Sequence, residues 1–237
     1  MFSPRFLAVL LSLGGLLVVS LPPTPLLAQS GYLRPVVIEK KSEYHFLVRK
    51  DPEQALLELG RVIEKPVYDL RYATNDNFTG QSLYPPGTDV CYLRKPAAEA
   101  LARVAISLRQ KGWGLKIFDA YRPYGVTELF WKLIGDERYV AHPAKGSGHN
   151  RGIAVDLTLI DLRTQQELDM GTGFDNFSDT AHHSFTGLPT AILQNRKLLR
   201  EAMIAEGFVA LETEWWHYSL PNGARFGLLN LPFKKIK

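Results

Sequence analysis

The sequence contains two short segments, far apart along the chain, whose side chains must meet in space if they act together. The segment Ser147-Gly-His-Asn-Arg-Gly-Ile-Ala-Val-Asp156 places a histidine seven residues before an aspartate, and Glu214-Trp-Trp-His217 places a carboxylate three residues before a histidine. Two imidazoles and one carboxylate are a sufficient ligand set for a catalytic zinc ion, which keeps a fourth position for water. The two segments therefore favour a fold that brings His149, Asp156 and His217 around one metal. Glu214 would then remain free to act as general base on the bound water.

Each of these spacings is common by chance when it occurs alone. The two carboxylates could instead be ordinary surface groups, and Trp215 and Trp216 could serve only to pack the core. The joint occurrence of both segments, with small residues beside the candidate ligands, favours the metal site over these alternatives.

The first 29 residues differ in composition from the rest of the chain. They hold one basic residue, Arg5, no acidic residue, and an apolar run from Phe6 to Leu21 that is followed by prolines and by Leu26-Leu27-Ala28-Gln29. This order is typical of a cleaved secretory signal, and it predicts export to the periplasm or cell envelope rather than a cytoplasmic location. The alternative is an uncleaved membrane anchor, because the apolar run approaches the length needed to span a bilayer. If the signal is cleaved, no stable membrane partner is expected.

Charge and cysteine content exclude several classes of function. The formal net charge is +4, and cleavage after residue 29 would remove Arg5 and leave +3. Since no run of Lys and Arg with interleaved aromatic residues occurs, nucleic acid is not an expected partner. Cys91 is the only cysteine, which rules out both an intrachain disulfide and a four-cysteine zinc site. The sequence gives no indication of the oligomeric state.

The pattern of apolar residues divides the chain into an N-terminal extension (30–66), a region with denser helix and strand signals (67–220) and a C-terminal tail (221–237). Helices and strands alternate without a regular βαβ rhythm, so the expected fold class is α+β and not a doubly wound parallel sheet. The expected helices cover 52–59, 96–111, 126–133 and 190–206, and the expected strands cover 67–74, 115–118, 152–159, 208–211 and 215–220.

The strand expected over 152–159 has a direct consequence for the metal site. Ile153, Val155, Leu157 and Leu159 would share the core face, so that Asp156 points to the opposite face. His149 cannot share a face with Asp156 on a regular strand because seven is an odd step, but Gly148 and Gly152 permit a bend between them. Glu214 and His217 likewise require a turn or bulge at Glu214-Trp215.

Several motifs together resemble the D-alanyl-D-alanine dipeptidases, the vancomycin-resistance type of zinc dipeptidase in peptidase family M15. The resemblance covers roughly 67–220, with the motifs in family order, and it implies that this region is the zinc dipeptidase catalytic domain. It also implies the compact fold that these enzymes share with the Hedgehog signalling domain, with an antiparallel sheet and flanking helices. The motifs are Tyr68-Asp-Leu-Arg-Tyr-Ala-Thr-x-Asp-Asn-Phe-Thr-Gly80, Asp119-x-Tyr121-Arg122-Pro123, Ser147-x-His149-x-Arg151-Gly152-x-Ala154-x-Asp156, Gly173-Phe174-Asp175-x-Phe177 and Glu214-Trp-Trp-His217.

The resemblance also implies a role for each matching position. His149, Asp156 and His217 would be the ligands of one Zn²⁺ per chain, and Glu214 would be the catalytic base. Arg122 falls where the family has an arginine that stabilises the transition state. Three positions match substrate-contacting residues, and the aspartate among them would lie near the substrate ammonium group: Ser147, Asp175 and Tyr72.

The expected reaction is hydrolysis of D-alanyl-D-alanine or a related short dipeptide of D-amino acids. A zinc D,D-carboxypeptidase or endopeptidase acting on peptidoglycan stem peptides is the nearest alternative, and an open groove in place of a closed pocket would favour it. A non-catalytic, zinc-stabilised binding module of the Hedgehog type would require that Glu214 or Arg122 be missing or misplaced.

Overall fold

The computed structural model describes residues 31–236, so the signal-like segment 1–29 lies outside the described residues. The chain divides into two compact units, 1–33 and 34–237, and the fold below is that of the second. Within the described part of the chain, none of the helices combines the length and the hydrophobicity that crossing a bilayer requires.

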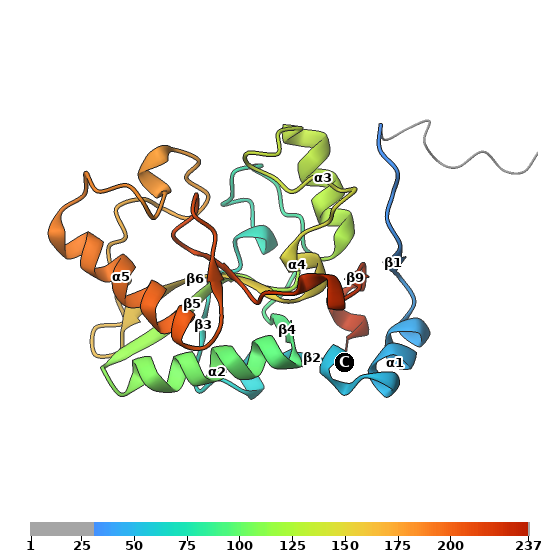
Figure 1. The fold of residues 1–237 in the computed structure, drawn as a ribbon, viewed down its shortest axis with the longest axis horizontal. Coiled ribbons are helices and arrows are strands. Elements are labelled where there is room, and N and C mark those ends of the chain that lie inside the picture. The colour runs from blue at the N-terminus through green and yellow to red at the C-terminus, as the bar shows by residue number, and fades with distance from the viewer. Residues whose placement is uncertain (1–30, 237) are drawn as a thin grey trace, which may run out of the picture. The chain divides into compact units, whose positions relative to one another are not determined.

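A five-stranded sheet forms the centre of the fold (Figure 1). Its strands, in spatial order, are β3 (Val67–Tyr68), β5 (Trp113–Asp119), β6 (Ala154–Asp161), β8 (His217–Ser219) and β7 (Val209–Ala210). Neighbouring strands run antiparallel except for the β3–β5 pair, which is parallel. The prediction of an α+β fold with an antiparallel sheet is therefore confirmed, apart from this one parallel edge.

Two small sheets join segments near both ends of this unit to the rest of it. Strand β2 (Leu56–Glu58) pairs antiparallel with β4 (Tyr92–Arg94), and β1 (Val37–Ile38) pairs in parallel with β9 (Leu228–Leu229). Strands from the predicted extension are thus hydrogen-bonded to the predicted catalytic region and to the predicted tail.

The helices lie around the central sheet, with α2 along one side and α3 on the other (Figure 1). Helix α2 also contacts α5. The bounds are α1 (Lys41–Lys50), α2 (Lys95–Arg109), α3 (Tyr124–Ile134), α4 (Gly148–Arg151) and α5 (Thr190–Ala205). Single 3-10 turns cover Pro52–Gln54, Leu59–Arg61, Arg71–Ala73, Asp179–Ala181, Gly223–Arg225 and Phe233–Lys235. The helices predicted over 96–111, 126–133 and 190–206 are confirmed, with ends shifted by one or two residues.

The main hydrophobic core lies between the sheet and α2. Leu101, Val104 and Leu108 are fully buried on one face of this helix, as their spacing predicts, and they belong to the same cluster as Val155 and Leu157 of β6. The opposite face of β6 is buried as well, and Asp156 on that face is only 2% exposed. Because both faces of β6 are covered, Asp156 points into a buried polar site and not towards open solvent.

Two predicted elements are wrong. The helix expected over 52–59 is a single 3-10 turn followed by β2, because the backbone of Leu56–Glu58 is paired with β4. Tertiary strand pairing here overrides the local helical preference. The strand expected over 67–74 ends at Tyr68, and the chain then forms the 3-10 turn Arg71–Ala73, which buries Tyr72.

Candidate metal centre

Sheet register places two of the predicted ligands opposite each other. Asp156 of β6 and His217 of β8 are paired residues in neighbouring antiparallel strands, and Asp119 of β5 is the partner of Asp156 on the other side. In such a pair the two side chains project from the same face of the sheet at close range. The His217 Nδ1 atom lies 2.8 Å from Asp156 Oδ1. The expected turn before His217 is present, since the His217 amide donates to the carbonyl of Glu214.

The third predicted ligand, His149, reaches the sheet from the short helix α4. Ser147 caps this helix in a reciprocal capping box with Asn150, and Gly152 ends it in the left-handed conformation, with a φ of 71°. A glycine is favoured at such a helix end because a Cβ atom is strained there. The bend that was predicted from Gly148 and Gly152 is therefore present, but it takes the form of one helical turn and not of an open loop.

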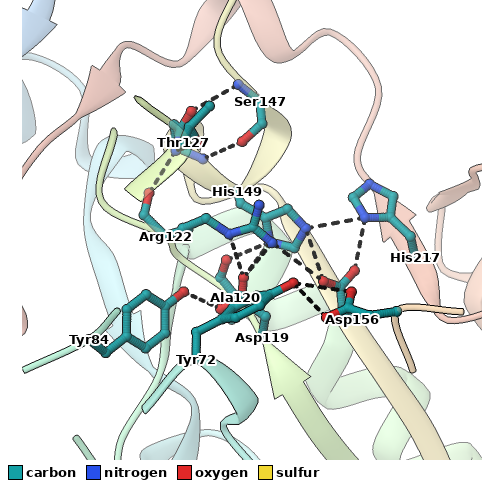
Figure 2. A network of polar contacts seen from close by, with 12 residues as sticks. Tyr72, Tyr84, Asp119, Ala120, Arg122, Thr127, Ser147, His149, Asp156 and His217 are labelled. Carbon is teal, nitrogen blue, oxygen red and sulfur yellow. Dashed lines mark hydrogen bonds and ion pairs between the residues drawn. The ribbon is translucent and has the colours of Figure 1, made fainter. Parts of the chain in front are cut away.

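The donor set fits a zinc ion. The His149 Nδ1–H group donates to the carbonyl oxygen of Ala120 at 2.7 Å, which leaves the Nε2 lone pair free. That Nε2 atom lies 3.2 Å from His217 Nδ1 and 3.3 Å from Asp156 Oδ2 (Figure 2). Ligand atoms from these three residues all lie within 4.8 Å of one another, and no other such group occurs within residues 31–236. Imidazole nitrogen and carboxylate oxygen are ordinary zinc ligands, and a carbonyl that orients a ligating histidine is a common outer partner.

The charges of the cluster favour metal-binding protonation states. Burial alone would raise the pKa of Asp156, but the two facing imidazoles outweigh this effect and hold its pKa below the usual range. Burial alone would lower the pKa of His217, but the Asp156 carboxylate outweighs this effect and raises it. Asp156 therefore stays ionised, which a metal ligand requires, whereas a proton competes with the metal for His217.

Glu214 lies at the edge of the cluster. Its Oε2 atom is 3.8 Å from His217 Nδ1, and its side chain is 19% exposed. Burial raises the pKa of Glu214, although the nearby imidazoles oppose the shift. A carboxylate with a raised pKa is better suited to take up and return a proton near neutral pH.

Arg122 borders the same cavity and is also paired with Asp119. Its Nη2 atom lies 2.8 Å from Asp119 Oδ2 and 3.8 Å from Asp156 Oδ2. The guanidinium lies 5.0 Å from the ring centre of Tyr72 and 4.7 Å from that of Phe130. Pairing with Asp119 therefore does not remove Arg122 from the site, because it holds the cation beside the metal cluster.

The three predicted substrate-contacting residues line one cavity with the metal cluster. This cavity has a volume of about 310 Å³ and is bordered by Ser147, Tyr72 and Asp175. The Tyr72 hydroxyl donates to the Asp175 carboxylate at 3.0–3.1 Å. Burial, and after it repulsion from Asp156, raises the pKa of Asp175 well above its usual value.

Sequence patterns missed several residues that support the site. Asn150 is fully buried, and its side-chain amide donates to the carbonyl of Arg122 and to the Thr127 hydroxyl, which ties α4 to the start of α3. Tyr84 donates to Asp119 from a loop. No periodicity in the sequence marks Asn150 or Tyr84.

Two imidazoles, a buried carboxylate ligand and a further carboxylate at the edge of one cavity define a metal-dependent hydrolase centre. The family model for D-ala-D-ala dipeptidase, peptidase M15, matches residues 52–236. This match is wider than the stretch over which the motifs occur.

Curated relatives agree with this match. The D-alanyl-D-alanine dipeptidase of Escherichia coli K12 is 40% identical over 175 residues, covering 73% of this chain and 89% of that protein. The D-alanyl-D-alanine dipeptidase of Enterococcus faecalis V583 is 32% identical over 186 residues, covering 71% and 92%. That of Streptomyces coelicolor is 36% identical over 174 residues, covering 65% and 85%. The chain therefore belongs to the D-alanyl-D-alanine dipeptidase family of M15 metallopeptidases, whose cofactor is zinc.

Proposed function

We propose that this protein hydrolyses D-alanyl-D-alanine, or a closely related free dipeptide, at a zinc ion held by His149, Asp156 and His217. What supports a free dipeptide in particular is the environment of Asp175. This carboxylate borders the cavity of the metal cluster and accepts a hydrogen bond from Tyr72. It forms no ion pair with any residue of the described chain, although a buried carboxylate is costly without a cation. The ammonium group of an unblocked dipeptide supplies such a cation.

The metal ion and Glu214 would have separate roles in the proposed reaction. A zinc ion at this site would lower the pKa of a bound water to about 7 and polarise the substrate carbonyl. We infer that Glu214 accepts the proton of the attacking water and delivers it to the departing amine, which its position 3.8 Å from His217 supports. Its raised pKa suits both steps, because the carboxyl group must be ionised in the first and protonated between them.

Arg122 and Ser147 act on the substrate carbonyl and on the peptide. The guanidinium of Arg122 is permanently charged and held rigidly by Asp119, so it can stabilise negative charge that develops on the carbonyl oxygen. The Ser147 hydroxyl accepts from the Asn150 amide as a helix cap, and its own proton remains available for donation to the substrate.

Replacement of Asp175 by alanine is expected to lower kcat/KM for D-Ala-D-Ala by at least ~30-fold, because the substrate ammonium would lose its buried partner. N-acetyl-D-Ala-D-Ala has no ammonium group, so the wild-type protein should cleave it poorly and the substitution should not impair its cleavage further. Steady-state kinetics with both substrates measures this difference. Glu99→Gln is a control, since it removes one carboxylate from an exposed position on α2 that lines neither this cavity nor the one that adjoins it.

Cleavage of only the blocked substrate by the wild-type protein would refute the dipeptidase proposal and support the carboxypeptidase alternative. One observation favours that alternative. A second cavity of about 250 Å³ adjoins the first and shares Glu214, Thr213 and Tyr139 with it, which leaves room for a longer peptide. A non-catalytic Hedgehog-like module is not favoured, because Glu214 and Arg122 both border the cavity.

We also propose that the protein acts on cell-wall-derived peptides after export to the periplasm or cell envelope, with residues 1–29 removed as a signal peptide. The composition of that segment supports this location. Mass spectrometry of the protein expressed from the full-length sequence in a Gram-negative host should find a chain that begins near Ser30. Recovery of the intact chain in the cytosolic fraction would contradict the proposal.

A further inference from the structure

A buried tyrosine outside the predicted site is bonded to the ion pair that holds Arg122. The hydroxyl of Tyr84 donates to Asp119 Oδ1 at 2.5 Å, and the two residues are 4% and 1% exposed (Figure 2). Burial raises the pKa of Tyr84 well above its usual value, and the negative charge of Asp119 adds to the shift. The hydroxyl therefore keeps its proton and acts as a permanent donor.

The two oxygens of Asp119 have separate partners. Asp119 Oδ2 accepts from Nε of Arg122 at 2.8 Å and lies 2.8 Å from Nη2, so it contacts two nitrogens of the guanidinium. Among the described residues, the Tyr84 hydroxyl is the only side-chain donor bonded to Oδ1. Loss of this hydroxyl would leave one oxygen of a buried carboxylate without a donor, and the carboxylate could then rotate away from Arg122.

We propose that Tyr84 is a positioning residue, which acts through Asp119 to fix the guanidinium of Arg122 beside the metal cluster. This inference rests on the proposed function, in which Arg122 stabilises charge on the reacting carbonyl. The chain of contacts runs from a loop residue through a strand end to the cavity, and each link is a charged or charge-assisted hydrogen bond. Such bonds are shorter and stronger than neutral ones, which suits them to hold a catalytic cation in place.

The ring of Tyr84 has a packing role that can be separated from its hydroxyl. Its ring centre lies 6.0 Å from that of Tyr72 and 5.0 Å from that of Phe233. Phenylalanine would keep both contacts, so Tyr84→Phe removes the hydrogen bond and leaves the aromatic cluster in place. The substitution therefore tests the hydroxyl alone.

Tyr84→Phe is expected to lower kcat for D-Ala-D-Ala about tenfold and to change KM by less than twofold. The reason is that Arg122 contacts charge that develops only in the transition state, so its misplacement affects turnover more than ground-state binding. Expressing kcat per bound zinc excludes a contribution from unfolded protein.

A double-mutant cycle with Arg122→Ala tests whether the effect passes through Arg122. If it does, Tyr84→Phe causes no further loss of kcat in the Arg122→Ala background. An equal tenfold loss in both backgrounds, or an unchanged kcat in the single variant, would overturn the inference. Failure of Arg122→Ala to reduce kcat would instead refute the role of Arg122 in the proposed function.

Tyr121→Phe is the matched control for a merely structural effect. Tyr121 is also a buried tyrosine next to Phe233, and its hydroxyl both donates to the carbonyl and accepts from the amide of Leu231. This variant loses two hydrogen bonds to Leu231, and neither of them involves Asp119 or Arg122, so it should lower the melting temperature and leave kcat unchanged.

Discussion

Glu214→Gln is expected to lower kcat for D-Ala-D-Ala by roughly 10³-fold while the chain retains one bound zinc ion. A positioned general acid–base group typically contributes between 10² and 10⁴ in rate. Glutamine keeps the shape of the side chain but can neither accept nor return a proton. Because Glu214 lies 3.8 Å from His217 and is not one of the three clustered ligands, its replacement leaves the donor set complete. Steady-state kinetics together with metal analysis of the purified variant measures both parts of this result.

Glu212→Gln provides the matched control. Glu212 is an exposed carboxylate two residues earlier, and its structural contact is a backbone hydrogen bond from His183, which the substitution preserves. This variant should turn over substrate at the wild-type rate. Wild-type turnover in Glu214→Gln would exclude Glu214 as the base, and loss of zinc from that variant would show that it serves as a ligand instead.

The sequence predicted those parts of the fold that have strong periodicity. Leu101, Val104 and Leu108 repeat at helical spacing, and the alternation along 153–159 is that of a strand, so α2 and β6 followed directly. The helix expected over 52–59 failed because a short apolar segment has no fixed preference, and pairing with β4 decided its structure. The strand expected over 67–74 failed in its second half, where the chain turns to bury Tyr72.

The sequence indicated which residues could form the candidate site, but it did not predict how the fold brings them together. Spacing and resemblance identified His149, Asp156 and His217, yet they converge because of the register that pairs β6 with β8 and because of the single turn of α4. The register has no signature in the local sequence, and Gly148 and Gly152 predict a bend without specifying that it is a helical turn. Tyr84 and Asn150 support the site from positions without periodicity, so their roles depend on long-range contacts that only the fold defines.

Removal of the metal is expected to abolish turnover, and the stability that zinc confers should grow with pH. Without zinc, Asp156 raises the pKa of His217 above its usual 6.5. Protonation of His217 therefore stabilises the zinc-free fold fully below pH 6.5, and this stabilisation is lost as the pH rises through the raised pKa. Zinc requires the neutral imidazole, so its apparent affinity increases about tenfold per pH unit for each proton that it displaces. As the pH rises, the zinc-free fold becomes less stable and zinc binds more tightly. The difference in melting temperature between zinc-loaded and chelator-treated protein should therefore widen from pH 5.5 to pH 8.5.

His217→Ala separates this effect from a general influence of pH. The variant should bind zinc more than ~10²-fold less tightly, a larger loss than the 10- to 100-fold that outer-sphere partners cause. Its melting temperature should then respond to neither zinc nor chelator at micromolar metal. His45→Gln is the control, since His45 is an exposed residue of α1 and its replacement should preserve the wild-type response.

A difference in melting temperature that is independent of pH in the wild-type protein would mean that zinc displaces no proton from His217. The buried pair of Asp156 and His217 would then not be the group with which the metal competes, and the assignment of His217 as a ligand would fail.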